Sequence, residues 1–269
     1  MYVSTRLGRW FYEERGTKRR ESDATIVLWH SFLCDGGMWD GQIDALAKIG
    51  HVIVFDGPGH GKSEPPPPFT LDDNTRALVD ALDTIAKGPV VMAGLSWGGM
   101  LSMRLSLLEP KRLRAQVLMD TSSDPEEMGR QIKYRAMLAL YRRAGVPRWL
   151  VDKHIAPIMF GPKTVAGRPD LVERLFCEVN GYSRVGVLNA AKAIFWREGV
   201  TGTLGRITTP TLVLCGSEDK ATPVVCSRTI ARNIPGARLL LIAGAGHLSA
   251  VEEPEAVCDA MLPFVCGHL

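Results

Sequence analysis

The chain has 269 residues, enough to bury the core of one large domain without help from a partner. Hydrophobic residues make up 46% and charged residues 23%, proportions that exclude an intrinsically disordered chain. The net charge of +3 is too small to indicate a nucleic-acid or membrane-surface partner, and no apolar run approaches the roughly 18 residues of a membrane span.

The N-terminal segment predicts a cytoplasmic location. Residues 1–6 contain neither the apolar segment nor the cleavage site of a signal peptide. The basic cluster at residues 18–20 has glutamates close by at 13, 14 and 21, so we interpret it as a solvated loop.

Short runs of β-branched and aliphatic residues recur along the chain and predict strands, several of them covered on both faces. They are Trp10–Glu14, Thr25–Trp29, His51–Phe55, Val90–Ala93, Ala115–Met119, Thr211–Cys215 and Arg238–Ile242. The segments with helical spacing between and after them are Asp72–Ile85, Trp97–Leu108, Val224–Asn233 and Pro254–Phe264. This alternation predicts an α/β fold with a mostly parallel, twisted sheet and helices on both faces.

The strand pattern stops between Ser122 and about Thr201. Helical segments rich in Leu, Met and Arg replace it, at Glu126–Ala144, Pro147–Phe160, Pro169–Asn180 and Ser183–Glu198. We therefore expect a core made of residues 1–121 and 202–269, with residues 122–201 inserted as a helical lid. Because ligands of open α/β sheets bind beyond the carboxyl ends of the strands, the lid can select the substrate. The alternative is a structural cover without a role in specificity.

A candidate nucleophile lies between a predicted strand and a predicted helix. Ser96 is the centre of Gly94-Leu95-Ser96-Trp97-Gly98, which follows the apolar run at 89–93. An abrupt turn from strand to helix forces such a serine into a strained backbone conformation, so its neighbours must be small. Glycine at positions 94, 98 and 99 satisfies that requirement.

A serine hydroxyl needs a base to take its proton, and the base needs an acid to fix its tautomer. His247 follows the last predicted strand, and Asp219 follows the strand before it. The order Ser96, Asp219, His247 is that of nucleophile, acid and base in one class of hydrolase. Asp120, which ends the strand after the serine helix, is the alternative acid. His30 and His60 are interpreted as loop-ordering residues.

These motifs resemble the α/β-hydrolase superfamily in content and order, over essentially the whole chain. Within it, Asn180-Gly181-Tyr182, the strand at 210–216 and the stretch from His247 to Glu252 resemble the 3-oxoadipate enol-lactonase group and its esterase relatives. The resemblance implies an α/β-hydrolase fold and an oxyanion hole with two backbone N–H donors. One donor is expected from Trp97 and the other from Phe32, in the loop after the strand Thr25–Trp29.

Two other patterns point away from bound cofactors. The stretch 56–63 ends in Gly-Lys-Ser like a phosphate-binding loop, but Asp56 stands where that motif requires glycine, and prolines occupy positions 65–68. It resembles a structural turn of the same superfamily. Six cysteines, at 34, 177, 215, 226, 258 and 266, form no C-x-x-C pair and have no zinc spacing, so we expect free, mostly buried thiols. No metal and no organic cofactor is expected.

The main hypothesis is a serine esterase or lactonase that acts through an acyl-enzyme on a small-molecule substrate, as a monomer or homodimer, with no nucleic-acid or membrane partner. Arginines of the lid could bind a substrate carboxylate or form a solvated helix face; they are Arg135, Arg142, Arg143, Arg148 and Arg184. Phe160, Phe195 and Trp196 could instead line an apolar pocket.

Two rival functions remain open at this point. A hydrolase that cleaves a carbon–carbon bond in a vinylogous diketone uses the same triad, but its relatives carry Asn before the nucleophile and an aromatic residue after the histidine, where this chain has Leu95 and Leu248. A non-catalytic ligand receptor on the same fold is the second alternative.

Overall fold

The computed structural model describes residues 1–18, 20 and 23–269. The basic cluster at 18–20, interpreted above as a solvated loop, falls partly on residue 19, and its neighbour Glu21 also lies outside the described residues.

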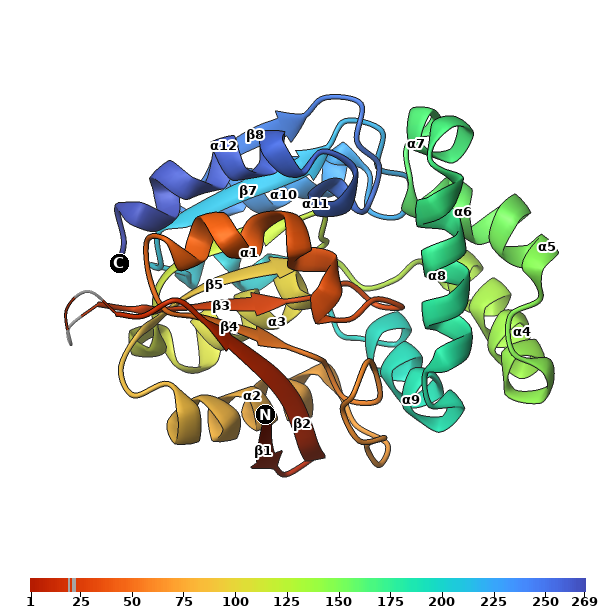
Figure 1. The fold of residues 1–269 in the computed structure, drawn as a ribbon, viewed down its shortest axis with the longest axis horizontal. Coiled ribbons are helices and arrows are strands. Elements are labelled where there is room, and N and C mark those ends of the chain that lie inside the picture. The colour runs from red at the N-terminus through yellow and green to blue at the C-terminus, as the bar shows by residue number, and fades with distance from the viewer. Residues whose placement is uncertain (19, 21–22) are drawn as a thin grey trace.

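A single twisted sheet runs through the centre of the described molecule (Figure 1). Its strands, in sheet order, are β1 (Tyr2–Thr5), β2 (Gly8–Arg15), β4 (Val52–Phe55), β3 (Thr25–Trp29), β5 (Val90–Leu95), β6 (Leu113–Met119), β7 (Thr211–Gly216) and β8 (Arg238–Ile242). The pairings β1–β2 and β2–β4 are antiparallel, and all pairings from β4 to β8 are parallel. The carboxyl ends of β3 to β8 therefore meet at one edge.

The seven predicted strands are all present, and β1 is an eighth that the sequence did not reveal. It is short and only Val3 is buried, so it has no continuous apolar run. β1 is a strand because it pairs with β2, in a register that places Val3 opposite Trp10.

The core helices cover both faces of the sheet. They are α1 (Asp40–Ala47), α2 (Leu71–Ile85), α3 (Trp97–Leu108), α10 (Val224–Asn233), α11 (Ser249–Glu252) and α12 (Pro254–Cys266), with 3-10 turns η1 (Gly36–Trp39), η2 (Pro110–Arg112) and η4 (Thr201–Arg206). Alternate residues of β3 separate the two cores. Ile26 and Leu28 pack in the cluster that includes α1 and α12, whereas Val27 and Trp29 pack in the cluster that includes α2 and α3.

Between β6 and β7 the chain forms only helices and loops, which we call the helical insertion (residues 122–201). Its elements are α4 (Met128–Ala144), α5 (Arg148–Leu150), a π-helical turn η3 (Val151–Ile155), α6 (Ala156–Met159), α7 (Pro162–Gly167), α8 (Pro169–Gly181) and α9 (Arg184–Phe195). The helix predicted over 147–160 is thus divided by a π-helical turn. Figure 1 shows the insertion beyond the carboxyl ends of the strands.

The cysteines are free, but the expectation that most are buried was wrong. Cys34 and Cys215 are buried, Cys226 and Cys258 are half-buried, and Cys177 and Cys266 are exposed. The last four lie on helices, where one face meets solvent.

Over residues 1–18, 20 and 23–269, no helix combines the length and apolar character that crossing a bilayer requires.

Candidate active site

Ser96 occupies the sharp turn between β5 and α3. Its backbone has φ 53° and ψ −104°, a conformation that L-residues rarely adopt. Two hydrogen bonds from neighbouring strand ends hold the turn: the Ser96 N–H donates to Met119 O at 2.8 Å, and the Thr121 hydroxyl donates to Ser96 O at 2.7 Å. The strain therefore persists because β6 and the residues after it support it.

The glycines around Ser96 allow the helix to start close to the strand. A Cβ at Gly94 would lie 2.2 Å from the carbonyl carbon of Gly98, and one at Gly98 would lie 2.4 Å from Trp29 O. Both obstacles are backbone atoms, which cannot rotate away. Only glycine fits at these two positions without moving α3 or β3.

We expect Gly94→Ala to lower the free energy of unfolding by about 3 kcal/mol, because the new methyl overlaps backbone on α3. Gly129→Ala is the matched control: a Cβ there meets nothing within 4 Å, and alanine stabilises an exposed helix position by about 0.5–1 kcal/mol. Urea denaturation of both variants measures the difference. Equal stability of the two variants would contradict the close approach of β5 and α3.

Asp219 and His247 form a buried hydrogen-bonded pair at the carboxyl edge of the sheet. The loop after β7 carries Asp219 and the loop after β8 carries His247, so adjacent parallel strands place them together. The Nδ1 atom of His247 lies 3.1 and 3.0 Å from the two carboxylate oxygens of Asp219. The sequence predicted both residues, and the geometry brings them into contact.

Thr222 is a part of this pair that the sequence analysis missed. Its hydroxyl donates to Asp219 Oδ2 at 2.9 Å, and the N–H groups of Ala221 and Thr222 donate to Oδ1 at 2.8 and 3.0 Å. An aspartate that binds N–H groups two and three residues ahead is a common turn-forming arrangement. The Asp-x-x-Thr spacing was therefore the available signal, and its effect is to fix the carboxylate that faces His247.

Asp120, the alternative acid, lies beside this pair but is bonded to other partners. Its Oδ1 accepts the Gly216 N–H at 2.7 Å, and its Oδ2 accepts the Ser249 hydroxyl at 2.5 Å. Asp120 thereby joins the end of β6 to the end of β7 and to the start of α11, two residues after His247. Burial and the Asp219 charge raise the pKa of Asp120 well above its usual range.

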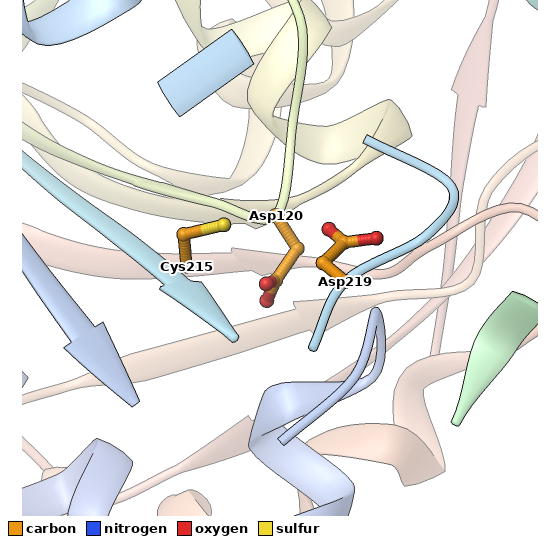
Figure 2. A group of neighbouring side chains, drawn as sticks. All are labelled: Asp120, Cys215 and Asp219. Atoms are coloured by element: carbon orange, nitrogen blue, oxygen red, sulfur yellow. The ribbon is translucent and has the colours of Figure 1, made fainter. Parts of the chain in front are cut away.

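Asp120, Cys215 and Asp219 are neighbours, with one potential ligand atom of each within 4.8 Å of the others (Figure 2). The donor set fits a metal ion poorly. The carboxylate oxygens of Asp120 and Asp219 already accept the hydrogen bonds described above. Burial raises the pKa of Cys215 to about 12, so its sulfur stays a thiol that donates to Gly216 O rather than a thiolate ligand. Hydrogen bonds therefore account for the cluster: Asp120 bonds Gly216 and Ser249, Cys215 bonds Gly216 O, and Asp219 faces His247.

The candidate oxyanion loop is held by His30. Its Nε2 accepts the Gly57 N–H at 2.6 Å, and its Nδ1 lies 2.7 Å from Ser31 O. Burial lowers the pKa of His30, which keeps the ring neutral as this pattern of one acceptor and one donor nitrogen requires. The prediction that His30 orders a loop is consistent with these bonds.

Phe32 and Trp97 are brought close through a shared neighbour. The His60 ring centroid lies 5.6 Å from that of Phe32 and 5.3 Å from that of Trp97. Trp97 is the first residue of α3, and the first N–H groups of a helix have no acceptor within it. The two residues proposed as oxyanion donors thus both pack against the ring of His60.

The stretch that imitates a phosphate-binding loop is a structural turn. Asp56 accepts the N–H groups of Gly36 and Lys62, both at 2.8 Å, and its carbonyl accepts the Ser63 hydroxyl at 2.7 Å. A Cβ at Gly61 would lie 2.1 Å from the Asp56 carboxylate. Asp56 therefore fills the space that an anionic phosphate would need.

Hydrogen bonds join the helical insertion to the loops that carry the candidate site. Buried Glu252 accepts the N–H groups of Gly161 at 2.7 Å and Gly246 at 2.8 Å, which joins the insertion to the residue before His247. On the other side, the Tyr182 hydroxyl donates to Asp35 at 3.1 Å. The role of Glu252 depends on atoms 91 residues away along the chain, so sequence spacing alone could not reveal it.

A cavity lies between the insertion and these loops. It measures about 20 Å³, room for one water molecule. Its charged lining residues, Arg174 and Glu178, bind each other at 2.6 Å, and the remaining lining is apolar or thiol: Cys34, Met38, Phe160, Leu171, Leu175, Leu248 and Val251. Of the predicted aromatic pocket residues, Phe160 is in this lining. The five arginines considered as carboxylate ligands are all exposed.

Comparisons with known proteins agree with this architecture. A model described as "Alpha/beta hydrolase family" matches residues 26–260. The chain is 30% identical to the putative carbamate hydrolase RutD of Variovorax paradoxus (strain S110), covering 91% of this chain and 92% of that protein. It is 27% identical to 3-oxoadipate enol-lactonase 2 of Acinetobacter baylyi (strain ATCC 33305 / BD413 / ADP1), over 88% and 86% of the two chains.

Among solved structures, a thermophilic esterase from Thermogutta terrifontis superposes with a TM-score of 0.90 and 27% identity, covering 100% of both chains. The expected fold class and the resemblance to enol-lactonases are confirmed. The described molecule carries the sheet, the turn at Ser96 and the buried Asp219–His247 pair in the order that the motifs predicted. The chain belongs to the alpha/beta hydrolase family.

Proposed function

We propose that this protein hydrolyses a carboxylic ester or lactone through an acyl-enzyme on Ser96. The observation that carries the proposal is the buried Asp219–His247 hydrogen bond at the same sheet edge as the strained serine turn. An imidazole held in one tautomer by a carboxylate is the base that a serine nucleophile requires. The relatives named as an esterase and an enol-lactonase support the same reaction class.

In the proposed reaction the Ser96 hydroxyl attacks the carbonyl carbon of the substrate. Nε2 of His247 takes the hydroxyl proton, because Nδ1 is engaged by Asp219. The Phe32 and Trp97 N–H groups stabilise the negative charge on the carbonyl oxygen. The proton then passes to the leaving alkoxide, and the acyl–serine ester remains. Water attacks that ester with the help of His247, which releases the acid and restores the serine.

The environment of His247 sets the expected dependence on pH. Burial alone would lower its pKa, but the Asp219 carboxylate, by charge and hydrogen bond, raises the pKa above the ordinary 6.5. The proposed base must be neutral, so activity is lost as the pH falls through this raised pKa.

We therefore expect the acid limb of kcat/KM to have its midpoint above pH 6.5, since kcat/KM reports the free enzyme. In Asp219→Asn the raising charge is gone, and the residual activity should have its acid limb at lower pH. Stopped assays with a neutral ester between pH 4 and 9, as approximate limits, measure both profiles. If the acid limbs of the two kcat/KM profiles had the same midpoint, the result would contradict the claim that Asp219 raises the pKa of His247.

We propose the small cavity as the acyl site; its lining outside the Arg174–Glu178 pair is apolar or thiol, which favours an uncharged, apolar acyl group. Because the cavity has room for about one water molecule, the acyl group must displace lining side chains of α8 or the Phe160 loop. A panel of p-nitrophenyl esters of increasing acyl length, with a matched panel of lactones, tests this. We expect turnover of short acyl groups and a decline with length. No turnover of any ester or lactone would favour the receptor alternative and overturn the proposal.

A further inference from the structure

The outermost helix of the insertion has an unusual charge distribution. Residues 128–151, which include α4 and α5, contain six basic side chains and no acidic one: Arg130, Lys133, Arg135, Arg142, Arg143 and Arg148. The net charge of the whole chain is only +3, so the rest of the molecule must be net acidic to balance this segment. Figure 1 shows α4 and α5 at the outer end of the insertion, away from the sheet.

An apolar stripe runs along the exposed face of α4. Met128 and Ile132 are 81% and 69% exposed, and Ala136 and Ala139 are exposed too. Their spacing of four, four and three residues places them on one side of a helix. Trp149, in α5, is 53% exposed. Single exposed apolar residues are ordinary, but a continuous stripe on one helix indicates a binding surface.

Basic residues flank the stripe on both sides. Arg135 and Arg142, seven residues apart, follow one edge, and Lys133 lies on the other. Within the described residues, Lys133, Arg142 and Arg143 form no ion pair. Of the nearby acids, Glu126 binds Arg130 and Arg197, Asp152 and Glu173 bind Arg148, and exposed Glu127 at the start of α4 pairs, in the described chain, with none of Lys133, Arg142 and Arg143. Across the residues that the structure describes, the charges of Lys133, Arg142 and Arg143 are therefore available to a partner.

We propose that the α4 stripe, with its flanking basic residues, docks on an anionic phospholipid surface. A helix with an apolar face and basic edges buries the apolar side chains at the boundary between headgroups and acyl chains, while its basic side chains bind anionic headgroups. An exposed tryptophan suits the same interfacial layer.

Other occupants match the surface less well. A second copy that paired α4 with α4 would bring two basic helices together, and like charges oppose that contact. Nucleic acid would attract the basic residues, but its phosphates offer nothing to the exposed Met128 and Ile132. Only an anionic amphiphilic surface satisfies both the charge and the apolar stripe. The small net charge of the whole chain gave no sign of the basic residues concentrated in residues 128–151.

Sedimentation with vesicles tests the proposal on the whole protein. We expect binding to phosphatidylcholine vesicles that contain about one third phosphatidylglycerol, weak binding to pure phosphatidylcholine, and loss of binding at high salt. The charge variant Lys133→Gln/Arg142→Gln/Arg143→Gln should reduce partitioning by about a hundredfold. Ile132→Ser should also reduce it. Turnover of a water-soluble ester should stay unchanged in both, which separates this test from the proposed catalysis.

Matched controls use exposed residues on the core. Val225 is 64% exposed on α10, so Val225→Ser controls for Ile132→Ser. Lys111→Gln/Arg228→Gln/Arg232→Gln removes the same charge from exposed positions elsewhere. Both controls should bind vesicles like the unchanged protein. Absence of binding to anionic vesicles, or equal loss in the charge variant and its control, would overturn the proposal and leave an acidic protein surface as the partner to seek.

Tryptophan fluorescence gives a second, independent readout. Trp10, Trp29, Trp39 and Trp97 are fully buried and Trp196 is half-buried beside Arg135 of α4, so Trp149→Phe is needed to isolate the signal of the exposed Trp149. We expect a blue shift with anionic vesicles that Trp149→Phe abolishes. A shift that persists in Trp149→Phe/Trp196→Phe would place the lipid contact elsewhere and contradict docking through α4 and α5.

Discussion

Ser96→Ala should lower kcat for a short p-nitrophenyl ester by at least about a thousandfold while the protein stays folded. Removing the hydroxyl leaves no nucleophile, but the Phe32 and Trp97 donors and the apolar pocket remain, so some rate above the solution reaction persists. The methyl of alanine is smaller than the serine side chain and accepts the same turn, so the fold should be preserved. Steady-state kinetics and circular dichroism measure the two effects.

Ser102→Ala is the matched control, because Ser102 lies on the same helix. Its hydroxyl donates to buried Gln116 at 2.8 Å, so its loss should lower stability by about 1 kcal/mol and leave kcat within about twofold. Equal turnover by Ser96→Ala and the unchanged protein would contradict the proposed nucleophile.

Asp219→Asn should lower kcat by about ten-thousandfold, whereas Asp120→Asn should lower it by less than about tenfold. The Asp219 carboxylate touches His247 Nδ1 and selects the tautomer with a free Nε2. An asparagine amide can present N–H to Nδ1 and so favour the wrong tautomer. At Asp120 an amide can still accept the Gly216 N–H and donate to the Ser249 hydroxyl, which rotates to accept it.

The two kcat values show which aspartate orients His247, because both aspartates are buried and only Asp219 faces the imidazole. Kinetics of the two variants, with melting temperatures as a check on folding, measure it. A larger loss in Asp120→Asn than in Asp219→Asn, at similar stability, would move the role of the acid to Asp120.

Local sequence patterns predicted the parts of the site that local geometry determines. The turn at Ser96 needs small neighbours within four residues, and Gly94 and Gly98 are the residues that meet this need. Loops after the last two strands placed Asp219 and His247 together, because the ends of adjacent parallel strands meet at one edge. Strands β3 to β7 were apolar enough to recognise because both of their faces are covered, whereas β2 and β8 are only partly buried and were recognised from their apolar residues alone.

The features that sequence missed depend on contacts between distant segments. Glu252 joins Gly246 to Gly161, and Asp120 joins Gly216 to Ser249; each bond is defined only once the fold has formed. Strand β1 depends on its pairing with β2 rather than on its own composition. From the sequence, α4 has the pattern of an ordinary amphipathic helix. The pattern alone does not show that its apolar stripe is exposed to solvent.

Trapping the acyl-enzyme tests the proposed chemistry most directly. The protein is mixed with p-nitrophenyl acetate, quenched in acid within the first turnover, digested and examined by mass spectrometry, with Ser96→Ala treated in parallel. We predict one acetyl group on the peptide that contains Ser96, and none on the corresponding peptide of Ser96→Ala. Rapid release of p-nitrophenol with no acetyl group on that peptide, or an acetyl group on another residue in step with turnover, would contradict an acyl-enzyme on Ser96.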